Sequence, residues 1–247
     1  MHGILAFFST LEYNYPSLKE KSEKMSKKTE TVLVTAFLAA QSVLYTLILT
    51  AGGAVLRWSE FGAIVLCAAF ALAHSKTGNK WIIFGLLCTL GADFFLVACQ
   101  PQQQLWGMVF FLGTQICYAV SLWLRRKNKG LLYVRLGLVL MAEIMTVLVL
   151  GNKTDALALI SLAYYAMLVM NIIVAFPQGD ISKNFPIALV LFLLCDTVIG
   201  LQVAAGGYLP IGEDSWLYNL LFSDFNLAWL FYLPSQVLVA LEAKRRN

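Results

Sequence analysis

The chain has 247 residues, of which 60% are hydrophobic and 13% are charged, and its mean hydropathy is +0.74. These values exclude an ordinary soluble domain and place the chain among polytopic membrane proteins. The net charge is +4, and the five cysteines are scattered singly, without the spacing of a zinc site. Nothing in this composition indicates a metal or a nucleic-acid partner.

Residues 1–30 are polar, with interleaved lysines and glutamates, and we expect a disordered or surface-lying cytoplasmic tail in which Met25 is an alternative start. Eight apolar segments follow, each of a length compatible with spanning about 30 Å of hydrocarbon, of which the second is the shortest. They cover 31–50, 58–73, 81–98, 105–124, 131–150, 156–176, 185–205 and 219–241. The loops between them are short, which predicts that the helices pack as neighbours in a single all-α membrane domain, 31–247.

The positions of the basic residues predict the orientation of the domain. If the N-terminus is cytoplasmic, every Lys and Arg except Arg57 and Lys153 falls on the cytoplasmic side. Positive residues are enriched in cytoplasmic loops. The pattern therefore favours eight transmembrane helices with both termini in the cytoplasm, and it indicates that the basic loop Arg125–Lys129 contacts anionic lipids.

The eight segments also indicate an internal repeat. The third and seventh each contain an aspartate, Asp93 and Asp196, and the fourth and eighth each contain a glutamine, Gln115 and Gln236, before a basic end. We infer two four-helix halves, approximately 31–130 and 131–247, inserted in the same direction as a parallel repeat. Chance similarity in a biased composition is the alternative.

The two aspartates are the strongest functional signal. Asp93 lies in GLLCTLGADFFLV and Asp196 in LVLFLLCDTVIGLQ, and each acid costs roughly 2.5 to 3.5 kcal/mol near the bilayer centre. Both lie about 15 to 18 Å along helices that start at the cytoplasmic face, so we expect them at similar depth. Gln115, Glu143 and Asn171 fall in the middle of their own segments, which predicts one polar cluster near the midplane.

A pair of buried carboxyl groups is typical of acid–base chemistry. The neutral acid can donate a proton, while the ionised one stabilises a cationic intermediate or activates water. The alternative is a packing role, in which each Asp bonds across helices to amide or hydroxyl groups such as Gln115 and Gln236. Glu60 and Asp224 lie near the outer ends of their segments, where a solvated cap is the simpler interpretation.

Four motifs resemble those of the YhhN family, which includes the lysoplasmalogenases. They are Thr89-Leu90-Gly91-Ala92-Asp93, Gly107 through Phe111 to Gln115-Ile116-Cys117-Tyr118, Cys195-Asp196, and Tyr232-Leu233-Pro234-Ser235-Gln236. The chain has Thr89, Ala92, Gln115 and Cys195 where the family pattern has Ser, Gly, His and Ser. The resemblance covers almost everything after the polar tail and includes both aspartates.

This resemblance implies an ether hydrolase that cleaves the vinyl ether bond of a lysoplasmalogen taken from the bilayer, without a metal or organic cofactor. Asp93 and Asp196 would be catalytic. The expected substrate-binding residues are Gln115, Tyr118, Glu143, Asn171, Tyr232 and Gln236. The protein would be a multi-pass protein of the cell membrane if its source is bacterial, and the sequence leaves its oligomeric state open.

Two other functions fit the same residues. Paired intramembrane acids in a duplicated fold also suit a proton-coupled carrier of a small solute or lipid. A catalytically degenerate membrane protein would keep the fold without turnover.

Overall fold

The protein is seen in a computed structural model that describes residues 27–125, 127–176, 183–205, 212, 214–223 and 225–244. The chain divides into two compact units, residues 1–42 and 43–247. In the first unit, residues 27–42 are helical and form the beginning of the helix Lys27–Thr50. The predicted tail up to residue 26 lies outside the described residues, whereas residues 27–30 already belong to this helix. All regular structure in the described ranges is helical.

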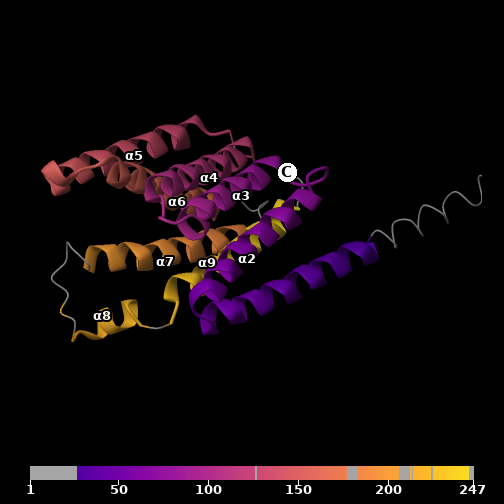
Figure 1. Cartoon of the computed structure of the whole chain (residues 1–247). Helices are drawn as coiled ribbons and strands as arrows, with labels where there is room; N and C mark the ends of the chain where they lie inside the picture. Colours follow the sequence, from indigo (N-terminus) through magenta and orange to yellow (C-terminus); the bar gives the residue numbers. More distant parts are fainter. Residues whose placement is uncertain are drawn as a thin grey trace, which may run out of the picture. The chain divides into compact units, whose positions relative to one another are not determined.

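The second unit contains the rest of this helix and eight further α-helices (Figure 1). Their bounds are α2 Gly53–Ala73, α3 Lys80–Asp93, α4 Gln104–Arg125, α5 Lys129–Leu150, α6 Ala156–Ala175, α7 Asn184–Ala205, α8 Trp216–Leu221 and α9 Leu227–Ala243. A π-helical turn, η1 (Phe94–Ala98), continues α3, and a short 3-10 turn, η2 (Gly151–Lys153), follows α5.

Seven helices in the described residues are long and apolar enough to cross a membrane, and they coincide with the first seven predicted segments. This confirms an all-helical, multi-pass membrane protein. The eighth segment differs from the prediction, because the chain leaves the helix after Leu221 and resumes at Leu227. The resulting α9 has 17 residues and a length of about 26 Å, so it lies at the lower limit for a membrane span.

Polar residues next to the apolar runs fix where the helices begin. The side chains of Asn79, Asn128, Asp155 and Asn226 each accept a backbone N–H from the first turn of α3, α5, α6 and α9. Such caps satisfy backbone donors that have no partner within the helix. Because these residues stand directly before hydrophobic stretches, the sequence boundaries and the observed boundaries agree closely.

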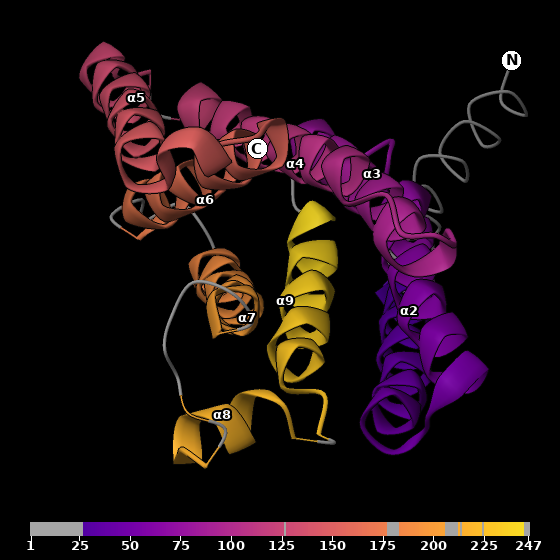
Figure 2. The ribbon, with the colours of Figure 1, turned by 60° about the vertical axis from the view of Figure 1, so that its left-hand side comes forward.

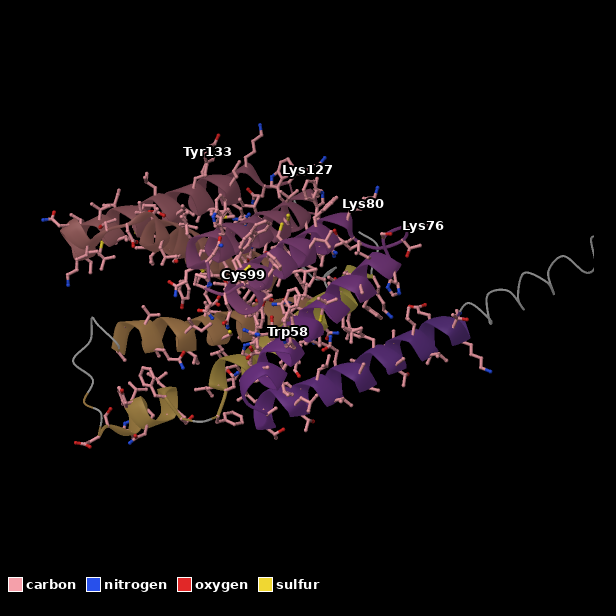
Figure 3. The ribbon with its side chains drawn as sticks, viewed as in Figure 1. Trp58, Lys76, Lys80, Cys99, Lys127 and Tyr133 are labelled. Carbon is pink, nitrogen blue, oxygen red and sulfur yellow. The ribbon has the colours of Figure 1, made fainter. Side chains whose placement is uncertain are left out.

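Helices α3, α4, α7 and α9 position the polar residues of the second unit. Helix α7 packs against α6, α8 and α9, and α3 packs against α2, α4 and α9. Figures 1 and 2 show α7 and α9 side by side. Helix α5 packs against α6. The parallel repeat and the cytoplasmic orientation of both termini stay predictions. Figure 3 labels Lys76, Lys80 and Lys127 at the same end of the helices, which is the arrangement that the charge pattern predicts.

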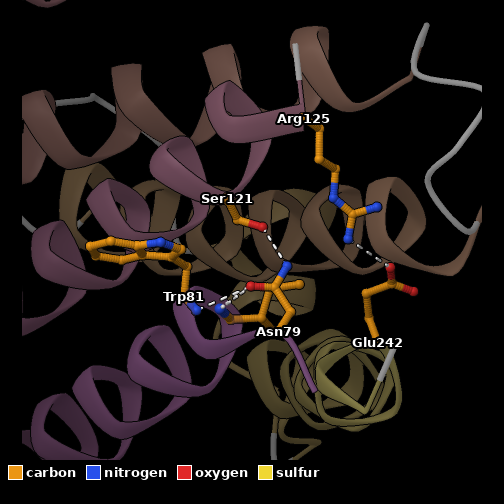
Figure 4. Close-up of polar contacts among 6 residues, drawn as sticks. Asn79, Trp81, Ser121, Arg125 and Glu242 are labelled. Atoms are coloured by element: carbon orange, nitrogen blue, oxygen red, sulfur yellow. Dashed lines mark hydrogen bonds and ion pairs between the residues drawn. The ribbon is translucent and has the colours of Figure 1, made fainter. Parts of the chain in front are cut away.

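A polar contact group holds this lysine-bearing end together (Figure 4). Asn79 caps α3, donates through Nδ2 to the Ser121 hydroxyl of α4 at 2.7 Å, and donates its backbone N–H to the carbonyl of Ala243 in α9 at 2.9 Å. Arg125 of α4 forms an ion pair with the buried Glu242 of α9 at 3.7 Å. The end of α9 is thereby fixed to α3 and α4.

Pro234 interrupts the hydrogen bonding of α9 close to Tyr232. Proline has no backbone N–H, so the carbonyl four residues earlier, that of Leu230, loses its usual donor within the helix. The Tyr45 hydroxyl donates to this carbonyl at 2.9 Å. A side chain from the first transmembrane helix therefore satisfies the backbone group that the proline leaves open.

Candidate functional site

Asp93 is the last residue of α3 and is 3% exposed. The Tyr232 hydroxyl of α9 donates to its Oδ2 at 2.6 Å. The helix changes to π-helical geometry directly after Asp93, and the N–H of Cys99 donates to the carbonyl of Phe94 at 2.8 Å. Such π turns are rare and frequent at functional sites. Asp93 therefore lies at a helix irregularity, with its carboxyl group held by a phenol.

Asp196 lies within α7 and is half-buried. The Tyr164 hydroxyl of the neighbouring helix α6 donates to its Oδ2. One residue along both helices, the Tyr165 and Thr197 hydroxyls lie 3.2 Å apart. Each predicted acid thus has its own tyrosine partner, from a different helix in each case.

Four rings lie between the two carboxyl groups, and we call Phe111, Tyr164, Phe192 and Tyr232 the aromatic cluster. The Phe111 ring centroid lies 5.7 Å from that of Tyr164, 5.6 Å from that of Phe192 and 6.3 Å from that of Tyr232. Phe192 lies 5.5 Å from Tyr232 and 6.2 Å from Tyr164. The acids are therefore connected through the rings of their tyrosines, and no hydrogen bond joins these two described carboxyl groups.

A separate polar group connects α4, α5 and α6. Asn171 donates from Nδ2 to both the side-chain Oε1 and the backbone carbonyl of Gln115, at 2.9 Å each. Its Oδ1 accepts a hydrogen bond from Nη2 of Arg135 at 2.9 Å. We call Gln115, Arg135 and Asn171 the amide group. It brings together two of the predicted substrate-binding residues and adds an arginine.

The other predicted residues lie in different surroundings. Tyr118 is fully buried, its ring centroid 5.5 Å from that of Phe185, and it leaves no space for a side chain at Gly85 of α3. Gln236 is fully buried one turn after Tyr232 on α9, and its Oε1 has no hydrogen-bond partner among the described atoms. Glu143 is half-buried on α5, with no hydrogen bond or ion pair to a described residue, and the structure does not bring it to the aspartates.

A cleft of about 580 Å³ lies on the Asp93 side of the second unit, and we call it the α2–α9 cleft. Its lining includes Arg57 and Glu60 from α2, Leu96 and Val97 from η1, and Trp229 from α9. The Trp229 ring centroid lies 4.9 Å from that of Tyr232, the partner of Asp93. The π turn after Asp93 therefore forms one wall of the cleft, and the ring beside Tyr232 forms another.

Glu60 is not the solvated cap that its position near a segment end predicted. It is 9% exposed, and its Oε1 accepts a hydrogen bond from Nδ2 of Asn226, the cap of α9, at 2.9 Å. Glu60 lines the α2–α9 cleft together with Leu96 and Val97 of the π turn that follows Asp93. Packing of α2 against α9 and η1 covers a position that the sequence places near the membrane surface. Asp224, interpreted in the same way, lies outside the described residues.

Sequence reasoning did not single out Tyr164 or the contact made by Arg135. Tyr164 is a hydroxyl-bearing residue in the middle of an apolar segment, which is the signal that could have identified it. Arg135 is a charge seven residues into α5, and its position indicated orientation alone. The partners of both residues come from other helices, so their pairing depends on the packing.

Comparison with curated proteins and with solved structures gives no match. The family model of the YhhN family matches residues 56–243, a range that includes α3, α4, α7 and α9 with both aspartates. A match over that much of the chain shows that this protein belongs to the YhhN family.

Proposed function

We propose that the protein hydrolyses the vinyl ether bond of lysoplasmalogens, releasing a fatty aldehyde and a glycerophospho-base. The observation that carries the proposal is the pair of membrane-embedded aspartates, each bonded to a tyrosine at one end of the same aromatic cluster, beside a cleft. Family membership supports this reaction class. The membrane location suits a lipid substrate that enters from the bilayer.

The reaction needs one proton donor and one water molecule. A proton adds to the vinyl carbon farther from oxygen, and the electrons of the double bond form the new C–H bond and leave an oxocarbenium ion. Water adds to the cationic carbon and loses a proton to give a hemiacetal. The hemiacetal then loses the glycerol oxygen as an alcohol and becomes the aldehyde. The net change consumes one water, and the proton donor regains its proton.

We assign the proton donor to Asp93 and the stabilisation of the cation to Asp196. Asp93 is the acid whose tyrosine partner contacts the wall of the α2–α9 cleft. Asp196 lies at the other end of the aromatic cluster, where a negative charge and the ring faces would both favour a cationic intermediate. This division uses both acids and needs no other ionisable group in the proton-transfer and hydrolysis steps.

The amide residues are proposed to hold the glycerol part of the substrate and the water. Gln115 and Gln236 lie four residues after Phe111 and Tyr232 on α4 and α9, so each side chain falls on the same helix face as a ring of the cluster. Asn171 orients Gln115 through its side-chain oxygen. Tyr118 packs one turn beyond this region and would shape the apolar space for the alkenyl chain.

An aldehyde-release assay with detergent-purified protein tests the proposal. The wild type should release aldehyde from an alkenyl lysophospholipid and none from the saturated alkyl ether analogue, which has no double bond to protonate. In D₂O the aldehyde should carry one deuterium on the carbon next to the carbonyl. Asp155→Asn is the matched control, since this exposed residue caps α6 and Asn caps equally well. Absence of aldehyde from the wild type would contradict the proposal.

One observation favours a second candidate, a proton-coupled carrier. The π turn directly after Asp93 and the break between α8 and α9 are the helix irregularities that carriers use around an ion or substrate site. A carrier would move solute into proteoliposomes in response to a proton gradient without releasing aldehyde. The two assays on one preparation therefore separate the candidates.

A further inference from the structure

We infer that the α2–α9 cleft binds the head group of the lysolipid, with Arg57 holding the phosphate and Glu60 the ammonium group. The inference deepens the proposed function and rests on it for the identity of the lipid. Its basis is a cleft in which side chains of opposite charge stand one turn apart on the same helix.

Arg57 is available for an anion. Its Nε is buried without a hydrogen-bond partner, and the guanidinium makes no ion pair with any described carboxylate. Its Cζ lies 5.3 Å from the ring centroid of Trp58, so the guanidinium is placed by an aromatic neighbour. A planar guanidinium with unused donors matches the oxygens of a phosphate. A buried polar atom without a protein partner requires an explanation, and a bound phosphate would supply one.

Glu60 is placed for a cation. Asn226 donates to Oε1, which leaves the second carboxylate oxygen, Oε2, to accept from an ammonium donor. Trp229 lines the same cleft, and its ring can stabilise a quaternary ammonium that donates no hydrogen bond. Arg57 and Glu60 lie about 6 and 10 Å along α2 from Gly53, a depth that suits a head group near the membrane surface.

The geometry also orients the rest of the lipid. The cleft wall continues from Trp229 to Tyr232 and then to Asp93. A head group in the cleft would therefore direct the glycerol and its vinyl ether toward the acid that we assign as the proton donor. The alkenyl chain would extend among the apolar helices.

The test compares KM for four alkenyl lipids that differ only in the head group: phosphoethanolamine, phosphocholine, phosphate alone, and glycerol without phosphate. Arg57→Gln should raise KM about tenfold or more for the three phosphate lipids and leave the phosphate-free lipid within about twofold. Glu60→Gln keeps the acceptor for Asn226 and removes the charge, so it should raise KM for the two ammonium lipids relative to phosphate alone. Lys153→Gln, the loss of another charge from a described helix end, is the control.

A binding measurement separates this inference from the proposed function. Saturated alkyl analogues, which cannot be cleaved by this route, should raise the apparent Tm of the wild type when they carry a phosphate, and should not raise that of Arg57→Gln. If the wild type releases no aldehyde but this difference remains, the hydrolase proposal fails and the head-group site stands. If aldehyde is released and Arg57→Gln treats all four lipids as the wild type does, the head-group site is wrong. Arg57→Lys keeps the charge, and its KM should lie between those of the wild type and Arg57→Gln. This variant provides the test if Arg57→Gln folds poorly.

Discussion

The surroundings of the two aspartates differ, although the predicted repeat places the two acids at matching positions. Asp93 is buried at the end of α3, followed by a π turn, and takes its tyrosine from α9, 139 residues away. Asp196 is half-buried within a regular helix and takes its tyrosine from the adjacent helix α6, 32 residues away. The cleft and Glu60 lie on the Asp93 side. The two acids therefore need not have the same role. The first test is whether Asp93 is the proton donor and Asp196 the stabilising charge, or the reverse.

The largest expected effect is that of Asp93→Asn. Asn keeps the shape and can still accept from Tyr232, but it has no acidic proton, so aldehyde release should fall by about 10²- to 10⁴-fold. Asp196→Asn should fall less, about 10- to 100-fold, because it removes a stabilising charge and leaves the donor. The kcat of each variant with an alkenyl lysophospholipid measures this difference.

Folding must be equal for this comparison to be valid, which size-exclusion profiles and apparent Tm values of the two variants establish. If Asp196→Asn loses more activity than Asp93→Asn, the assigned roles are reversed. Unchanged activity in both variants would remove the acids from the mechanism.

The tyrosines give the next largest effect. Tyr232→Phe and Tyr164→Phe each delete one hydroxyl and keep the ring in the aromatic cluster. Tyr232→Phe should lower kcat about tenfold or more, because it frees the carboxyl group of the proton donor. Tyr164→Phe should lower kcat by less than this. Equal losses in steady-state kinetics would show that both phenols act alike and would weaken the distinction between the two sides.

Hydropathy predicted most of the fold. Seven segments appear within a few residues of their predicted bounds, since a run of apolar residues next to Asn or Asp specifies a helix locally. The prediction for the eighth segment was wrong at residues 222–226, where the polar residues of the sequence FSDFN interrupt the apolar run and Asn226 caps a new helix. The π turn after Asp93 also has no simple local signature in the sequence. Family membership, expected from four short motifs, is confirmed.

The sequence predicted which acids belong to the candidate site, but it did not predict which residues they contact. An acid within a hydrophobic run is costly enough to be noticed without a structure, which identified Asp93 and Asp196. Their partners Tyr232 and Tyr164 come from other helices, and Glu60 is covered by a helix 166 residues away along the chain. Such pairings are set by tertiary packing. Glu143 is the opposite case. It is also an acid within a hydrophobic run, but it lies on α5, which packs against α6, and the structure does not bring it to the aspartates.

The amide group gives a prediction about stability on the Asp196 side. Asn171→Leu removes the acceptor of Arg135 and the donor to Gln115, so two polar groups lose a partner inside the protein. Each such loss costs about 1 to 3 kcal/mol. The apparent Tm in detergent should fall by several degrees, at about 2 to 4 °C per kcal/mol. Asn219→Leu on the exposed face of α8 is the control, and an equal fall there would show that the effect is not specific to the group.

The smallest expected effect compares one hydrogen-bonded tyrosine on each side. Tyr45→Phe leaves the Leu230 carbonyl without its donor, and Pro234 cannot supply another, so stability should fall by about 1 kcal/mol or more. Tyr165→Phe removes a 3.2 Å contact to Thr197, but that hydroxyl still donates to the Leu193 carbonyl at 2.7 Å. Its effect should stay within about 0.5 kcal/mol, as for substitutions that leave no buried group unsatisfied. Thermal unfolding of both variants measures the difference, and a loss for Tyr45→Phe no greater than that for Tyr165→Phe would show that the proline break on the Asp93 side does not depend on Tyr45.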